Sequence, residues 1–355
     1  MTARVFIMAG GTGGHIFPGL AVAEELKKRR AEVDWIGASH GLEGRLVPEK
    51  GIPLHLLAVR GLRGKHGLSK VLGPLRLIVS IVQALWLMAR LRPEVCVGFG
   101  GYPAGPGGLA ARMLGIPLVI HEQNAVAGMT NRHLAKWATR VLTAFDDVLP
   151  GGECVGNPIR AEIDAVGRRR LADGHQSSGN TRILVIGGSQ GARTLNQQLP
   201  EKLREVAAQY GIEITHQTGV SGQADVESTY DALNLDATVV AFISRMDQAY
   251  QSSDIVVCRA GALTVSELAS AAMPSVLIPF PYAVDDHQTK NGKQLEAAGA
   301  AVIVQEDDLD IFVAKMSDIL RAPENLTQMA RAARSVAKPE ATQAVADVVL
   351  EVAGG

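Results

Sequence analysis

The chain has 355 residues, of which 47% are hydrophobic and 20% are charged, and its formal net charge is −1. The length predicts about two domains, the composition excludes a largely disordered chain, and the charge argues against a nucleic-acid partner. Three widely spaced cysteines, Cys96, Cys154 and Cys258, contain no CxxC pair and argue against a disulfide framework or a zinc site. Strand-like residues begin at Arg4 without a signal-peptide pattern, so we expect a protein of the cytosol.

Short apolar runs alternate with longer helical patterns along the sequence. The runs in the first half are 4–9, 33–37, 55–59, 95–99, 118–121 and 141–143. Those in the second half are 182–186, 213–216, 238–241, 255–258, 275–278 and 301–304. Such alternation, with strands that are apolar throughout, predicts an α/β fold of parallel sheets with helices on both faces.

The two halves open with similar segments, RVFIMAGGTGGH at 4–15 and RILVIGGSQGAR at 182–193. We therefore expect two doubly wound, Rossmann-like domains, at 1–158 and 159–337. The boundary is expected in Pro158–Asn180, where arginines, an Asp-Gly pair and a Ser-Ser-Gly run break the pattern. The segment Lys338–Val352 is typical of a final helix, with Pro339 near its start.

The stretch MAGGTGGHIFPG, Met8 to Gly19, places several glycines between a strand and a helix start. Unpaired N–H groups and the positive helix end favour an anion such as a diphosphate there. The dinucleotide pattern GxGxxG fails because Ile16 fills its third glycine position, and no GxxxxGK[ST] occurs. A tight βα turn without a ligand is the alternative, but a second such turn at Gly187–Arg193 favours ligand binding.

His15 follows these glycines at once. Its imidazole suits a general base that takes a proton from a hydroxyl near neutral pH. A capping or solvated histidine at a helix start is the alternative. Gln123 and Asn124 follow another predicted strand end, which is where parallel sheets bind ligands, and they are further candidates.

The segment 254–280 holds a second group of candidates. Its strand ends near Cys258, and a helix is expected to begin near Thr264. Thr264 and Glu267 have the spacing of a capping box. The alternative is that the Glu267 carboxylate accepts hydrogen bonds from the two hydroxyls of a ribose.

Two polar runs follow. The run DDHQTKN at 285–291 combines acids, an imidazole and amides, which suits sugar hydroxyls or a polar helix start. Asp308 and Asp310 have the DxD spacing that binds a divalent ion in some sugar transferases. They precede a helical run, 311–320, so we predict helix-start acids and no metal site.

The interval between Glu49 and Glu94 contains no acid and many bases, namely Lys50, Arg60, Arg63, Lys65, Lys70, Arg76, Arg90 and Arg92. The apolar residues among them are Val71, Leu72, Leu75, Leu77, Ile78, Ile81, Val82, Leu85 and Trp86. The uncharged run 77–89 is shorter than the roughly 20 residues that a spanning helix needs. Both a helix that docks on an anionic leaflet and a core helix with solvated basic ends fit this pattern.

Seven motifs, in order, resemble one family closely. They are GGTGGH at 10–15, GLRGK at 61–65, GGYPAGPGG at 100–108, HEQN at 121–124, GNPIR at 156–160, GGSQGAR at 187–193 and CRAGALTVSE at 258–267. The ordered set spans nearly the whole chain and resembles the bacterial N-acetylglucosaminyltransferases of peptidoglycan synthesis. The resemblance implies a GT-B fold, in which two Rossmann-like domains face a cleft and the last helix, 338–355, packs back on the first domain.

The resemblance also implies a reaction. GlcNAc would pass from UDP-GlcNAc to the 4-hydroxyl of MurNAc in lipid I (undecaprenyl-diphosphoryl-MurNAc-pentapeptide), with inversion at the anomeric carbon, to give lipid II. The implied partners are these substrates, the anionic inner leaflet, and other cell-wall synthesis or division proteins, with no required cofactor or metal. The implied location is peripheral, on the cytoplasmic face of the bacterial inner membrane, in a role that supports cell shape and division.

Site residues carry over by motif match. His15 is implied as the general base. The implied UDP-GlcNAc site is Thr12, Gly13, Gly14, Asn124, Arg160, Ser189, Ile243, Ala262, Leu263, Thr264, Val265, Ser266, Glu267 and Gln288. Glu267 would meet the ribose, the Ile243 backbone the uracil, and Gln288 the GlcNAc, while His287 stands where the family commonly has a second glutamine. The residues implied in membrane association are Arg63, Lys65, Lys70, Leu75, Arg76, Ile78 and Trp86.

Two other functions fit parts of the same pattern. A UDP-sugar epimerase would share the nucleotide features without needing a lipid surface. A nucleotide-regulated, membrane-associated binding protein would bind UDP without turnover. In the transferase, both glycine turns would stabilise the leaving UDP through their N–H groups and helix ends.

Overall fold

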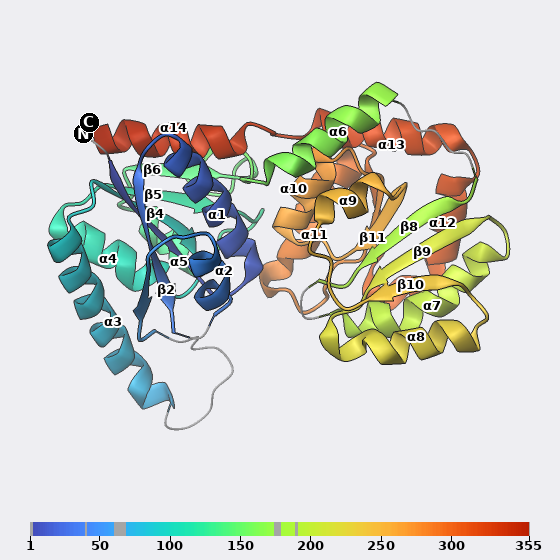
Figure 1. Ribbon diagram of the computed structural model, residues 1–355, viewed down its shortest axis with the longest axis horizontal. Helices are drawn as coiled ribbons and strands as arrows, with labels where there is room; N and C mark the ends of the chain where they lie inside the picture. The colour runs from blue at the N-terminus through green and yellow to red at the C-terminus, as the bar shows by residue number, and fades with distance from the viewer. Residues whose placement is uncertain (1–2, 40, 60–68, 174–178, 189–190, 355) are drawn as a thin grey trace. The chain divides into compact units, whose positions relative to one another are not determined.

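The computed structural model describes residues 3–39, 41–59, 69–173, 179–188 and 191–354 (Figure 1). The chain divides into two compact units, Met1–Ile159 together with Lys338–Gly355, and Arg160–Ala337. The first unit leaves off at Ile159, one residue after the boundary predicted at 158. The second unit is therefore a continuous segment, whereas the first is completed by residues that follow the second.

The first unit is built on a seven-stranded sheet whose neighbouring strands are all parallel. The strand order is β3-β2-β1-β4-β5-β6-β7. The strands are β1 (Arg4–Ala9), β2 (Glu32–Ala38), β3 (Leu54–Leu57), β4 (Val95–Gly100), β5 (Leu118–Glu122), β6 (Arg140–Thr143) and β7 (Glu153–Cys154). The first six match the apolar runs, while the two-residue β7 is too short to leave a pattern in the sequence.

Helices cover both faces of this sheet. They are α1 (Gly13–Lys28), α2 (Glu43–Glu49), α3 (Ser69–Leu91), α4 (Ala104–Leu114), α5 (Met129–Leu134) and α14 (Ala341–Gly354). Because side chains alternate along a strand, Val5 and Ile7 enter one apolar cluster and Phe6 and Met8 enter the other. Each face of the central strand therefore has a core of its own.

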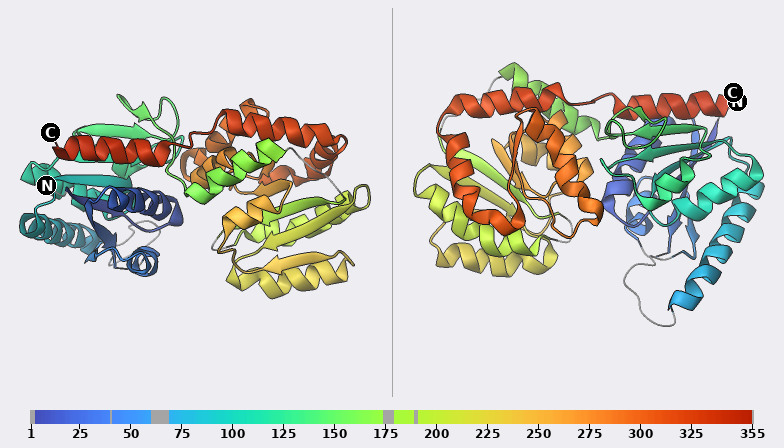
Figure 2. Two further views of the ribbon diagram at one scale, coloured as in Figure 1. Left: turned by 45° about the horizontal axis from the view of Figure 1, so that its top comes forward. Right: turned by 180° about the vertical axis from the view of Figure 1, so that it is seen from behind.

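The helix α14 belongs to the first unit. It packs against α1 (Figures 1 and 2), and Val345 and Val349 are fully buried in the cluster that α1 shares. An ion pair between Arg29 and Asp347 joins the two helices at the surface. The helix begins at Ala341, two residues after the proline that the sequence placed near its start.

The second unit is built on a six-stranded parallel sheet of order β10-β9-β8-β11-β12-β13. Its strands are β8 (Thr181–Ile186), β9 (Ile212–Gln217), β10 (Ala237–Val240), β11 (Ile255–Cys258), β12 (Ser275–Leu277) and β13 (Ala301–Ile303). Its α-helices are α6 (Ala161–Asp173), α7 (Arg193–Ala207), α8 (Gln223–Ala232), α9 (Met246–Gln251), α10 (Ala262–Ser270), α11 (His287–Ala297), α12 (Phe312–Leu320) and α13 (Pro323–Ser335). Short 3₁₀ turns lie at Val220–Gly222, Val284–Asp286 and Glu306–Ile311.

In both sheets, the direction in which the chain adds strands reverses beside the first strand. The chain builds outward from β1 to β3 and then returns to β4 on the other side, and β8, β9, β10 and β11 repeat this order. Doubly wound sheets bind ligands at the carboxyl ends of the strands at such a reversal. The turns that follow β1 and β8 are the two glycine turns, so the fold places each of them at this position.

The helix α3 is longer than the apolar run at 77–89 that the sequence singled out. It packs against α4 and places Ala84, Leu87 and Met88 in the core. Its part Gly73–Leu91 is long and apolar enough to cross a membrane, the one such helix among the described residues, with a mean hydropathy of 1.4. Only 22% of that segment is buried, so most of it faces away from the core.

Candidate functional site

The first glycine turn is an open helix start at the end of β1. Gly11 has a φ of +93°, and Gly101 at the end of β4 has a φ of +77° with room for no side chain, since a Cβ there would lie 2.2 Å from the Gly10 oxygen. The N-cap residue of α1, Thr12, is exposed and makes no side-chain cap bond, and Gly14 is exposed as well. A ligand can therefore reach the beginning of α1.

A carboxylate that the sequence analysis missed lies beneath this turn. The side chain of Glu43 is fully buried and accepts hydrogen bonds from the main-chain N–H of Gly11 (3.2 Å) and of Ala38 (2.9 Å). A Cβ at Gly10 would come within 2.4 Å of its Oε1. In sequence, Glu43 looks like an ordinary acid in the first turn of a helix, so nothing local marks its burial.

His15 is held by the end of β5. Its Nδ1 lies 2.9 Å from Oε1 of Gln123. Nε2 of Gln123 in turn lies 2.8 Å from the His121 oxygen and 3.0 Å from His121 Nδ1. The histidine and the glutamine that were proposed separately thus form one hydrogen-bonded group, which excludes a freely solvated His15.

Glu122 organises the loop that follows β5. Its carboxylate accepts hydrogen bonds from the Asn124 N–H (3.0 Å), Asn124 Nδ2 (3.2 Å), the Gly128 N–H (3.0 Å) and Asn131 Nδ2 (3.0 Å). Glu122 is only 1% exposed, whereas Asn124 is half-buried. In the HEQN motif, the glutamate therefore shapes the loop and the asparagine remains the residue that a ligand can contact.

The capping-box interpretation of Glu267 is wrong. Helix α10 begins at Ala262 with Gly261 as its N-cap, which puts Thr264 inside the first turn and Glu267 in the middle of the helix. The Glu267 carboxylate is buried and pairs with Arg160 Nη2 (3.0 Å) and with the Tyr250 hydroxyl (3.2 Å). Tyr250 is a residue of this cluster that no sequence motif indicated.

Burial and charge shift the pKa values in this cluster. Burial lowers the pKa of the Arg160 guanidinium, but the neighbouring Glu267 carboxylate more than offsets this and the pKa is raised. Burial, together with Glu267, raises the pKa of Tyr250 well above its usual range and that of Cys258 to about 12. Beside Glu267, the cluster therefore holds a charged guanidinium and a neutral phenol near neutral pH.

The other candidates that the structure describes in the second unit follow the strands β10, β11 and β12 in the chain. Ala262 and Val265 are buried in α10, while Leu263, Thr264, Ser266, Ile243 and Gln288 are half-buried. Gln288 Oε1 accepts a hydrogen bond from the Phe280 N–H (2.9 Å), and His287 Nδ1 pairs with the Val284 oxygen (2.9 Å). Ser189 lies outside the described residues.

The second glycine turn is supported by a neutral side chain. Oε1 of Gln217 accepts the Gly188 N–H (3.0 Å), and its Nε2 donates to the Gly188 oxygen (3.0 Å). An amide thus occupies the place that the Glu43 carboxylate has beneath the first turn. The two turns look alike in sequence but differ in charge.

Helix α3 presents an apolar face to its surroundings. Leu75, Ile78, Val82 and Trp86 are each more than half exposed, and the Arg90 guanidinium lies 5.2 Å from the centre of the Trp86 ring. Arg76 is half-buried. Lys70 belongs to α3, but the structure describes only its backbone. Arg63 and Lys65 lie outside the described residues. A purely buried core helix is therefore excluded for 73–91.

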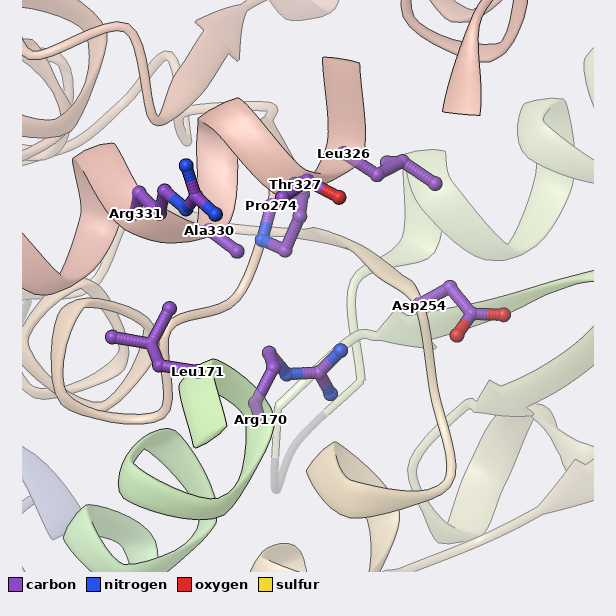
Figure 3. A pocket seen from close by; sticks show the side chains of 8 residues that line it. All are labelled: Arg170, Leu171, Asp254, Pro274, Leu326, Thr327, Ala330 and Arg331. Carbon is purple, nitrogen blue, oxygen red and sulfur yellow. The ribbon is translucent and has the colours of Figure 1, made fainter. Parts of the chain in front are cut away.

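Figure 3 shows a small crevice in the second unit. Its lining includes Arg170, Asp254 and Pro274, and its volume is about 30 Å³. Asp254 and Pro274 precede β11 and β12, so the crevice is at the amino edge of the sheet, opposite the glycine turn. Such a volume has room for about one water molecule, not for a nucleotide. No group of three or more metal-binding side chains occurs in the part of the chain that the structure describes.

Family models match both units. The glycosyltransferase family 28 N-terminal domain matches residues 5–143, and the family's C-terminal domain matches residues 182–347. A relative in Pseudomonas syringae pv. tomato, named UDP-N-acetylglucosamine--N-acetylmuramyl-(pentapeptide) pyrophosphoryl-undecaprenol N-acetylglucosamine transferase, is 46% identical over 360 residues and matches over the full length of both chains.

Solved structures agree in fold. The crystal structure of Acinetobacter baumannii MurG is 38% identical, with a TM-score of 0.82 over 98% of this chain and 99% of that one. A UDP-GlcNAc 2-epimerase from Neisseria meningitidis has a TM-score of 0.69 at 12% identity over 98% and 100% of the two chains, which shows a shared fold alone. With both family domains present and a relative of this similarity over its full length, the chain belongs to glycosyltransferase family 28, with the GT-B fold and MurG among its relatives.

Proposed function

We propose that this protein transfers GlcNAc from UDP-GlcNAc to the 4-hydroxyl of MurNAc in lipid I and so forms lipid II. The full-length similarity to transferases whose name states the donor and the lipid-linked acceptor supports this reaction. The observation that carries the chemistry is His15, an imidazole held by Gln123 at an open helix start. A base in that place can take the proton of an incoming hydroxyl.

The second unit is proposed to hold most of the nucleotide. Glu267 has lone pairs left on both oxygens after pairing with Arg160 and Tyr250, and these can accept the two hydroxyls of the ribose. The Ile243 backbone is proposed to meet the uracil and Gln288 the GlcNAc. The remaining proposed donor contacts are Thr12, Gly13, Gly14, Asn124, Arg160, Ser189, Ala262, Leu263, Thr264, Val265 and Ser266.

The charge beneath the two glycine turns suggests different tasks for them. A phosphate bound at Gly11 would lie within about 5 Å of the Glu43 carboxylate, and two like charges at that distance repel by about 3 kcal/mol at an effective dielectric constant of 20. The neutral Gln217 under the second turn causes no such repulsion. We therefore assign sugar hydroxyls to the first turn and the diphosphate to the second, in place of the expectation that both stabilise UDP.

The proposed reaction is a single displacement with inversion. His15 takes the proton of the acceptor hydroxyl, whose oxygen attacks the anomeric carbon of GlcNAc. The bond from that carbon to the diphosphate oxygen breaks, and UDP leaves with the electron pair. The N–H groups of the second turn and the start of α7 can stabilise the negative charge on the departing diphosphate. These steps need no cofactor.

We also propose a peripheral location on the cytoplasmic face of the inner membrane. The exposed apolar side chains of α3 can lie on an anionic leaflet, and Arg76 and Arg90 of the same helix can pair with its negative headgroups. Ala84, Leu87 and Met88 would have to leave the core if the helix crossed the bilayer, so the surface position is favoured. Other cell-wall synthesis or division proteins remain proposed partners.

The test is turnover with UDP-GlcNAc and a soluble lipid I analogue. We expect UDP release and a β-linked disaccharide product, and at least a hundredfold loss of kcat in His15→Ala with little change in the affinity for UDP, since a general base contributes roughly 10²- to 10⁴-fold. Epimerised UDP-sugar without acceptor would contradict the transferase proposal. UDP binding without any turnover would favour a nucleotide-binding protein instead.

A further inference from the structure

The hydrogen bonds around His15 specify which of its nitrogens is free to act. We propose that Gln123 and His121 are positioning residues that hold neutral His15 as its Nδ1–H tautomer, so that Nε2 is the atom that accepts the proton. This proposal rests on the proposed role of His15 as the base and adds the group that prepares it. The chain of contacts runs from His15 through Gln123 and His121 to the main-chain oxygen of Gly156.

The orientation of the Gln123 amide follows from its surroundings. One of its two terminal atoms lies 2.8 Å from the His121 carbonyl oxygen, which can only accept a hydrogen bond. That atom must therefore be the amide nitrogen, because an oxygen there would face another oxygen's lone pairs. The other terminal atom, 2.9 Å from His15 Nδ1, is the oxygen Oε1. The amide cannot be turned over without losing two hydrogen bonds.

His121 fixes the same arrangement from the other side. Its Nε2 lies 2.8 Å from the Gly156 oxygen, an acceptor, so this nitrogen carries the proton. Its Nδ1 then has a lone pair and accepts from Gln123 Nε2 at 3.0 Å. Burial lowers the pKa of His121 to about 4, although the Gly156 oxygen and the nearby Glu122 oppose this shift, so the ring is neutral at physiological pH.

Since Oε1 of Gln123 can only accept, His15 Nδ1 must donate. The lone pair of neutral His15 is then on Nε2. The ring is also packed in place, because Gly100 lies against it with a φ of +97°, and a Cβ there would be 3.2 Å from the His15 Cε1 and Nδ1 atoms. Substitution at Gly100 would both strain the backbone and crowd the ring.

Among the residues that the structure describes, no carboxylate forms a hydrogen bond or an ion pair with His15. The nearest acid in the same motif, Glu122, gives its oxygens to four N–H groups of the loop instead. In hydrolases that use a carboxylate to orient a histidine, the acid sets the tautomer and also stabilises the imidazolium. Here a neutral amide sets the tautomer, and an amide carries no charge to stabilise the imidazolium.

The test is nitrogen-15 NMR of the full-length protein labelled at histidine. The His15 signals are assigned by their loss in His15→Ala and are recorded above the pH at which the ring takes up its proton. We expect a protonated Nδ1 and a bare Nε2. A protonated Nε2 in the wild-type protein would overturn the proposal, and His15→Ala serves only to assign the signals.

Two substitutions connect the tautomer to turnover. Gln123→Leu removes the acceptor, so we expect His15 to shift toward the Nε2–H form that free histidine prefers and kcat to fall at least about tenfold, with KM for UDP-GlcNAc changed less than threefold. Gln123→Glu restores an acceptor oxygen for His15 Nδ1 and should restore the Nδ1–H form, but its second oxygen faces the His121 carbonyl oxygen, so only part of kcat should return. The control Gln209→Leu removes an exposed glutamine of the second unit and should change neither quantity.

The outcomes separate the two proposals. If Gln123→Leu is folded and His15 keeps its tautomer, the positioning role of Gln123 is refuted even if kcat falls. If the wild-type tautomer is as proposed but His15→Ala keeps full turnover, the base assignment fails while the hydrogen-bonded group stands.

Discussion

Replacing Glu267 with alanine separates its support of the fold from its proposed contact with the ribose. The change leaves the Tyr250 hydroxyl, in a side chain only 1% exposed, without its partner, at a cost of about 1–3 kcal/mol. The pair with Arg160 adds less than about 1 kcal/mol, because the arginine side chain is 38% exposed. The sum is about 1–4 kcal/mol, which in a unit of this size lowers Tm by roughly 2–16 °C.

The same change should also weaken the binding of UDP, and it should cost more binding free energy than free energy of unfolding. Two ribose hydroxyls that donate to a carboxylate contribute about 1.5–3 kcal/mol each. Their loss should weaken UDP binding at least tenfold, since 1.4 kcal/mol corresponds to a factor of ten. Calorimetry without ligand gives the stability, and titration calorimetry with UDP gives the affinity.

The matched control is Tyr250→Phe, which removes the buried hydroxyl and leaves the carboxylate with Arg160. It should lower Tm and weaken UDP binding less than Glu267→Ala does. In the Tyr250→Phe background the stability cost of Glu267→Ala should shrink to below about 1 kcal/mol. Equal losses of UDP affinity in the two single variants would refute the ribose contact and leave Glu267 with a structural role only.

Three further outcomes are expected. Glu43→Ala removes a charged acceptor from two main-chain N–H groups and should destabilise the first unit by about 3–6 kcal/mol; a change below about 1 kcal/mol by calorimetry would contradict its burial as a carboxylate. Serine at both Val82 and Trp86 should weaken sedimentation with anionic vesicles at least tenfold, whereas Leu171→Ser on the second unit should not. Burial lowers the pKa of His216 to about 4, below its ordinary 6.5, so the unfolded chain binds a proton first as the pH falls and the second unit loses up to about 3 kcal/mol between pH 6.5 and 4. Melting curves should show this slope, and His216→Gln should flatten it.

Much of the fold follows from local sequence. Twelve apolar runs became strands because each is short, apolar and bounded by turn residues, and the repeated strand–glycine–helix opening indicated two similar sheets. The extent of α3 was missed because its charged and proline-containing first turns do not share the apolar pattern of 77–89. The start of α10 was placed two residues late because Gly261, not a hydroxyl side chain, takes the N-cap position.

The contacts within the sites were harder to predict, because they join residues that are far apart in the sequence. Glu43 meets Gly11 across 32 residues, and Tyr250 meets Glu267 where α9 and α10 both pack against α6. The contact of His15 with Gln123 spans 108 residues and exists because β1, β4 and β5 are neighbours. Motifs identified the individual residues, but strand order decided which of them touch.

The position of α14 has a consequence for the order in which the chain folds during synthesis. Residues 160–337 form the whole second unit, and α14 is translated after them. The second unit can therefore complete its core while the first still lacks Val345, Ala346 and Val349, and the face of α1 that they cover stays exposed until then. Premature termination after residue 337 should consequently leave a sound second unit attached to an unstable first one, and the nascent first unit is the part that chaperones would need to protect.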